Sequence, residues 1–86
     1  MATELRAAER RLEQAYRSCA EAYGVALDGV SVRLVHAADC RIEGVVTLAG
    51  DPAKLRRLKA AVDRTSPALK ALRRRAPVCL GLELSA

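Results

Sequence analysis

Residues 50–67 constrain the fold more than any other part of the chain, because they predict one helix start, one helix end and a second helix start. Asp51 is a good N-cap, and Pro52 suits the first helical position, where its missing N–H is not needed. Ser66 and Pro67 repeat this cap-and-proline pair. The first helix has its apolar positions on one stripe: Leu55, Leu58 and Val62. The segment therefore predicts two consecutive helices with a break near Ser66.

Hydrophobic periodicity predicts the remaining elements. Apolar residues at steps of three and four predict a long first helix that ends at Gly24, and alternating residues predict a hairpin and a final strand. The predicted helices cover residues 3–23, 52–64 and 67–75, and the predicted strands cover residues 30–37, 41–49 and 77–85. This α-β-β-α-α-β order predicts an α+β two-layer sandwich, with the helices on one side of a three-stranded antiparallel sheet.

The alternation also divides the sheet into two faces. The face under the helices should form the core with the apolar helix positions: Leu34, Val46, Leu48, Leu58, Val62, Leu69, Leu80 and Leu82. The opposite face carries small or apolar residues that suit water poorly: Val35, Val45, Thr47, Cys79 and Gly81. We therefore expect something else to cover the second face or an edge strand.

The length of 86 residues predicts one domain with a thin core. The chain has no Phe or Trp, so the core is built from small aliphatic side chains and self-association would supplement it. The first residues lack the apolar segment of a signal peptide, and no apolar run approaches the roughly 20 residues that span a bilayer. We therefore expect a cytoplasmic protein with no membrane contact.

The three cysteines, Cys19, Cys40 and Cys79, are widely spaced and form no CxxC or Cys/His cluster. This pattern predicts free thiols in a reducing compartment and no metal site. His36 is the only histidine, and its spacing suggests no acid–base partner. No Gly-rich phosphate loop is present, and we expect no cofactor.

Positive charge is concentrated in residues 54–75, which hold nine of the fifteen basic residues and a single acid, Asp63. The rest of the chain has six basic and nine acidic residues, so the molecule is polarised rather than uniformly basic. The candidate residues for binding an anionic partner are the arginines of this region: Arg57, Arg64, Arg73, Arg74 and Arg75. The alternative is a solvated helical face.

The order of these motifs resembles the C-terminal half of the OsmC/Ohr family of hydroperoxide-resistance proteins. The matching features are a helix ending at Gly24, a Gly-Val-x-Leu-x-Gly-Val approach to the first strand, the hairpin, Gly50-Asp51, Ser66-Pro67 and Pro77-Val78. The resemblance implies an OsmC-like half domain over residues 1–86 that lacks the usual β-rich N-terminal half. It also implies a homodimer, because family members form intertwined pairs.

The chemistry that the resemblance implies is thiol-dependent reduction of organic hydroperoxides, as part of a stress response. The family uses one reactive cysteine on the long helix and another in a Cys-Pro motif. The first position falls near Arg11 or Leu12, and the second is Ser66. Neither position holds a cysteine, and Cys19 and Cys79 do not match the family positions. We therefore expect no enzyme activity.

Three functions remain open from the sequence. The first is a truncated OsmC-like module that binds a small ligand or a protein, as a homodimer or with a second subunit. The second is a residual OsmC/Ohr-type thiol peroxidase that uses Cys19 and another thiol. The third is an RNA-binding module, because type II KH domains share the element order. The KH motif needs a GXXG loop between its later helices, whereas residues 64–67 contain no glycine.

Overall fold

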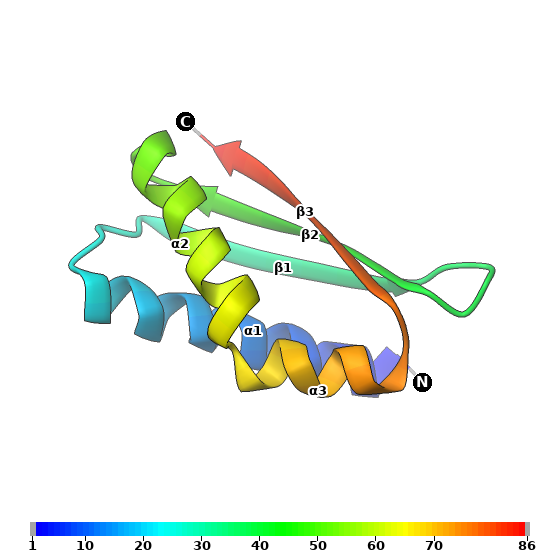
Figure 1. Cartoon of the computed structure of the whole chain (residues 1–86). Helices are drawn as coiled ribbons and strands as arrows, with labels where there is room; N and C mark the ends of the chain where they lie inside the picture. Colours follow the sequence, from blue (N-terminus) through cyan, green and yellow to red (C-terminus); the bar gives the residue numbers. More distant parts are fainter. Residues whose placement is uncertain (1, 86) are drawn as a thin grey trace.

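The computed structural model describes residues 2–85 and arranges them in two layers (Figure 1). The helices are α1 (Ala2–Tyr23), α2 (Pro52–Thr65) and α3 (Pro67–Arg75), and the strands are β1 (Gly29–His36), β2 (Ile42–Ala49) and β3 (Val78–Ser85). All three helices lie on the same face of the sheet. The α+β class and the element order are as predicted, and every boundary falls within one residue of its predicted place.

The sheet has the order β1-β2-β3 and is mixed. β1 and β2 form the predicted antiparallel hairpin, but β3 runs parallel to β2, so the prediction of a fully antiparallel sheet is wrong. The reason lies in the helices, because only Ser66 separates α2 from α3. One residue is too short to reverse the chain into an antiparallel helix pair, which needs a loop of about 2–5 residues. α2 and α3 therefore carry the chain onward to the end of the sheet where β2 begins.

Capping side chains place the two helices of this crossover. The Asp51 carboxylate accepts a hydrogen bond of 3.2 Å from the Lys54 backbone N–H at the start of α2. Ser66 closes α2 by donating its N–H to the Val62 carbonyl at 2.9 Å. Its hydroxyl then accepts the Leu69 N–H at 3.3 Å and begins α3. Ser66 therefore ends one helix and starts the next, as the sequence predicts.

α1 packs its apolar stripe against the sheet. Leu12 and Tyr16 are completely buried, and the helix ends at Gly24, whose φ of 68° lies in the left-handed region that glycine tolerates. The polar side of α1 also contacts the sheet, because the Glu9 carboxylate accepts the backbone N–H of Leu34 at 2.8 Å. This bond joins α1 to β1, which is an edge strand.

The core lies between the helices and the sheet, and it contains the predicted residues. Six of them are buried: Leu34, Val46, Leu48, Leu58, Val62 and Leu69. Leu80 and Leu82 are half-buried but pack against the same cluster, because β3 is an edge strand. Cys79 and Gly81 are exposed on the opposite face, so the predicted register of the last strand is correct.

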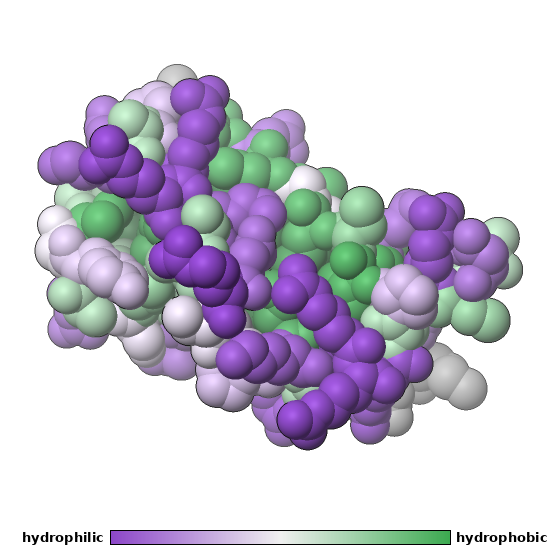
Figure 2. All heavy atoms as spheres, in the orientation of Figure 1, coloured by the Kyte–Doolittle hydropathy of each residue, from purple (hydrophilic) through white to green (hydrophobic). Residues whose placement is uncertain are grey.

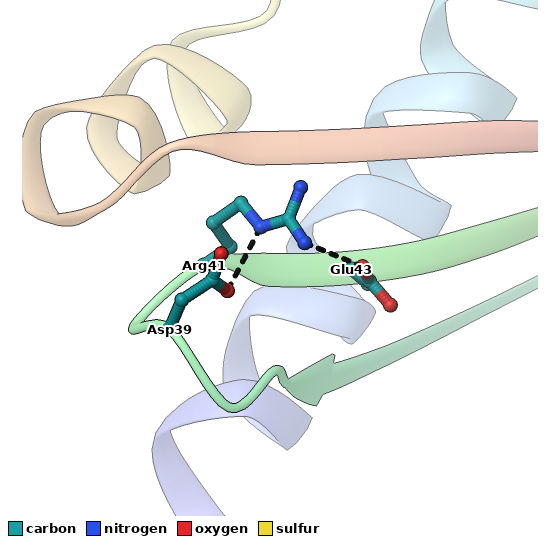
Figure 3. A network of polar contacts seen from close by, with 3 residues as sticks. All are labelled: Asp39, Arg41 and Glu43. Atoms are coloured by element: carbon teal, nitrogen blue, oxygen red, sulfur yellow. Dashed lines mark hydrogen bonds and ion pairs between the residues drawn. The ribbon is translucent and has the colours of Figure 1, made fainter.

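The β1–β2 hairpin turns through a short polar loop. Cys40 has a φ of 64°, which is unusual for a residue with a side chain. Next to it, Arg41 pairs with Asp39 at 2.9 Å and approaches Glu43 at 3.6 Å (Figure 3). All three side chains are about half-exposed, so these ion pairs contribute little to stability.

Candidate functional site

The thiols that peroxidase chemistry would need are separated by the sheet. Cys19 is half-buried on α1 and packs against the core, whereas Cys79 is exposed on the open face. Cys40 is exposed in the hairpin loop. Burial raises the pKa of the Cys19 thiol, which disfavours the nucleophilic thiolate. The described residues therefore bring no two of these sulfurs together as a reactive pair.

The two positions that the sequence resemblance predicts to match the family cysteines lie in the helical layer. Ser66 is buried, with 4% of its surface exposed, and its hydroxyl is held by the cap of α3. On α1, Leu12 is buried in the core. Arg11 lines a small cavity of about 190 Å³ between α1 and α3, together with His36 and Arg75.

A groove between the end of α1 and the length of α2 combines three cationic side chains with an apolar surface. Its volume is about 540 Å³. The floor is apolar, and its most buried members are Leu58 and Ala61. The cationic side chains along it come from α2: Lys54, Arg57 and Arg64. Figure 2 shows hydrophilic side chains lying over apolar surface on the face that the helices cover.

The five arginines predicted to bind an anionic partner are therefore placed in different settings. Arg57 and Arg64 line the same groove. Arg73 donates to the Asp63 backbone carbonyl at 3.4 Å, and Arg75 lines the small cavity beside Arg11. Arg74 is exposed in the last turn of α3. Binding of an anion by this set remains a prediction.

The open face of the sheet is partly apolar. Val35 is 58% exposed and Val45 is 43% exposed. In the strand register, Val45 lies between Arg33 on β1 and Gly81 on β3. A Cβ built on Gly81 would lie no closer than 3.9 Å to another atom, so the surface there is open.

One polar cluster was not recognised from the sequence. The Tyr16 hydroxyl and Asp63 Oδ1 are both buried and have no hydrogen-bond partner among the described residues. The other Asp63 oxygen pairs with the Lys59 ammonium at 2.8 Å. Burial, reinforced by the charge of Asp63, raises the pKa of Tyr16. The four-residue spacing of Lys59 and Asp63 predicts their ion pair. The apolar stripe of α1, however, gave no sign that the Tyr16 phenol would be buried where the Asp63 charge raises its pKa.

No group of three His, Cys, Asp or Glu side chains is placed to hold a metal ion within residues 5–85, the part of the chain whose side chains the structure describes. No helix among residues 2–85 combines the length and the hydropathy that crossing a bilayer requires.

Comparison with known proteins identifies the architecture. No protein-family profile matches the chain, and no curated protein matches its sequence. An organic hydroperoxide resistance protein OsmC from Legionella pneumophila superposes with a TM-score of 0.65 at 17% identity, covering 92% of this chain and 64% of that one. The organic hydroperoxide resistance protein OhrB of Bacillus subtilis gives 0.65 at 21% identity, covering 96% and 67%. The chain thus spans about two thirds of the length of these structures, and its fold is OsmC/Ohr-like.

Proposed function

We propose that this chain is a binding module built on the OsmC/Ohr-like fold, without thiol-peroxidase chemistry. The burial and the hydrogen bond of the Ser66 side chain are the main support for this proposal. This side chain is engaged as the cap of α3 at the position that the sequence resemblance matches to the family Cys-Pro cysteine. A hydroxyl cannot form the disulfide that resolves a cysteine sulfenic acid.

The remaining thiols support the same conclusion. In the family chemistry a thiolate attacks the peroxide, an alcohol leaves, and a second thiol converts the sulfenic acid to a disulfide with loss of water. Cys19 is a poor candidate for the first step, because burial raises the pKa of its thiol. Cys79 lies on the opposite side of the sheet and is a poor candidate for the second.

The test is consumption of cumene hydroperoxide with excess dithiothreitol. The wild-type protein is compared with a triple variant, Cys19→Ser with Cys40→Ser and Cys79→Ser. We expect both proteins to consume peroxide at the rate of dithiothreitol alone. Turnover by the wild type that Cys19→Ser abolishes would overturn the proposal and establish the residual peroxidase instead.

The proposed binding function also concerns the open face of the sheet, which another protein surface would cover. We propose that a second copy of this chain covers that face, with another protein subunit as the alternative. The exposure of Val35 and Val45 supports this, because burying apolar surface releases about 25 cal/mol per Å² before association costs. Arg33 and Glu83 lie on the two outer strands of this face. A two-fold axis parallel to the strands would place β1 over β3 of the second copy and bring these opposite charges toward each other.

Gly81→Glu tests this interface sharply, because the open space at Gly81 lets the monomer accept a side chain. Ala7→Glu is the control, since it adds the same charge on the exposed side of α1. In size-exclusion chromatography with light scattering, we expect a dimer for the wild type and the control and a monomer for Gly81→Glu. A monomeric wild type at high micromolar concentration, with cooperative unfolding, would contradict the proposed dimer.

A further inference from the structure

We propose that the groove between the end of α1 and the length of α2 binds a small amphipathic anion, a carboxylate attached to an aromatic or acyl body. This inference rests on the proposed binding function and names the ligand class. The groove is lined by Tyr23, Gly24, Val25, Lys54, Arg57, Leu58, Ala60, Ala61 and Arg64. No acidic residue is among them, so the groove combines an apolar floor with an entirely cationic set of charges.

The cations of this groove lack the partners that neighbouring cations have. Lys59, also on α2, is paired with Asp63. Among residues 5–85, whose side chains the structure describes, no carboxylate forms an ion pair with Lys54, Arg57 or Arg64. These three residues follow one side of α2 over about 15 Å at the helical rise of 1.5 Å per residue. Their guanidinium and ammonium groups are thus available to a carboxylate, which arginine binds through two parallel hydrogen bonds.

The rest of the groove suits the apolar part of such a ligand. Leu58 is 2% exposed and Ala61 is 5% exposed, so both form a floor rather than a rim. Tyr23 is 63% exposed at the end of α1, and its ring can pack against an aromatic or acyl group. Gly24 has no atom within 4 Å of a built Cβ, which leaves the groove open beside Tyr23.

The size and character of the groove favour a small molecule over a polymer. Its volume of about 540 Å³ lies within the range of small-molecule sites, roughly 300–1,000 Å³. A nucleic-acid backbone needs cations but gains little from an apolar floor. The groove also offers one exposed ring, whereas single-stranded nucleic acid is usually held by successive aromatic side chains.

The experiment titrates the full chain with 2-naphthaleneacetate, followed by 1H–15N correlation spectra and calorimetry. Its neutral analogue, 2-naphthaleneacetamide, is the matched ligand without charge. The double variant Arg57→Gln with Arg64→Gln removes two groove cations. The double variant Arg56→Gln with Arg74→Gln makes the same change in net charge at exposed positions outside the groove.

We expect saturable binding of the carboxylate, with shifts at the Gly24, Val25 and Ala61 amides. Affinity should fall about tenfold or more in the groove variant, stay unchanged in the control variant, and be about tenfold weaker for the amide. Equal affinity in the two variants, shifts confined to the open sheet face, or no saturation by about 10 mM would overturn the inference. Stronger, salt-dependent binding of a single-stranded RNA that displaces the carboxylate would assign the groove to nucleic acid. Peroxidase turnover would contradict the proposed function without affecting any of these results.

Discussion

The replacement of Tyr16 by phenylalanine tests the buried polar cluster beneath α1. The Tyr16 side chain is completely buried, and its hydroxyl has no hydrogen-bond partner among the described residues. Burial, with a further contribution from the Asp63 charge, raises the pKa of Tyr16 above its ordinary value. The folded chain therefore holds the phenol in its neutral form at a pH where the unfolded chain ionises it.

The sign and the size of the effect follow from this difference. Keeping the Tyr16 phenol neutral does not lower the free energy of unfolding at a pH below about 10, the pKa of tyrosine in the unfolded chain. As the pH rises above that value, ionisation of the unfolded chain progressively lowers the free energy of unfolding. At pH 11 an unfolded tyrosine is mostly ionised while Tyr16 is still neutral, which lowers the free energy of unfolding by about 1.4 kcal/mol. Tyr16→Phe removes this loss. At pH 8 the variant should be at least as stable as the wild type, because an unpaired buried hydroxyl costs about 1–3 kcal/mol.

The assay is urea unfolding, followed by far-UV circular dichroism at pH 8 and pH 11. Tyr23→Phe is the control, because it removes a phenol that is 63% exposed in the folded chain. Between the two pH values, the wild type and Tyr23→Phe should each lose about 1.4 kcal/mol more than Tyr16→Phe. A Tyr16→Phe variant that is less stable than the wild type by more than about 1 kcal/mol at pH 8 would refute this account of the phenol. That result would mean that the hydroxyl has a hydrogen-bond partner in solution.

Five further substitutions, at four positions, test the packing and the turns by thermal and urea unfolding. Gly44→Ala should destabilise the chain by about 1–3 kcal/mol, because a Cβ there would lie 2.5 Å from a Leu34 methyl carbon. Gly81→Ala should change stability by no more than about 0.5 kcal/mol, and equal effects of the two would contradict this account. Ser66→Ala should lower the free energy of unfolding by about 1 kcal/mol, because it removes the N-cap of α3. An unchanged stability would show that this cap does not fix the break between α2 and α3. The φ of 64° at Cys40 suits glycine and strains a β-branched residue. Cys40→Gly should therefore be at least as stable as the wild type, and Cys40→Val should be less stable by about 1 kcal/mol. The reverse order would show that the turn has a different backbone conformation.

Local chemistry in the sequence was enough to predict the elements and their buried faces. Asp51 and Ser66 signal helix starts through the hydrogen bonds that their side chains make, and these bonds are present. Alternation also gave the correct register of β3, since Leu80 and Leu82 face the helices. Alternation is the same for both strand directions, however, so it could not indicate that β3 is parallel to β2.

The candidate site could be predicted only in part for a similar reason. Spacing by seven residues places Arg57 and Arg64 on one side of α2, as a helix requires. The other wall of their groove comes from Gly24 and Val25, at the end of α1. That juxtaposition depends on how α1 packs against α2, and a periodic pattern within either helix does not contain it.

The hydrogen bond from Leu34 to Glu9 gives the two edges of the sheet different capacities for aggregation. At β1 a carboxylate already occupies a backbone N–H, so an incoming strand would have to displace a charged group from α1. At β3, the other edge, no hydrogen bond of this kind from a described side chain is present. If two chains join edge to edge through β3, both outer edges of the combined sheet are β1 strands. In each of them the Glu9 carboxylate accepts the backbone N–H of Leu34. Growth is then opposed at both outer edges, which favours a pair over a fibre.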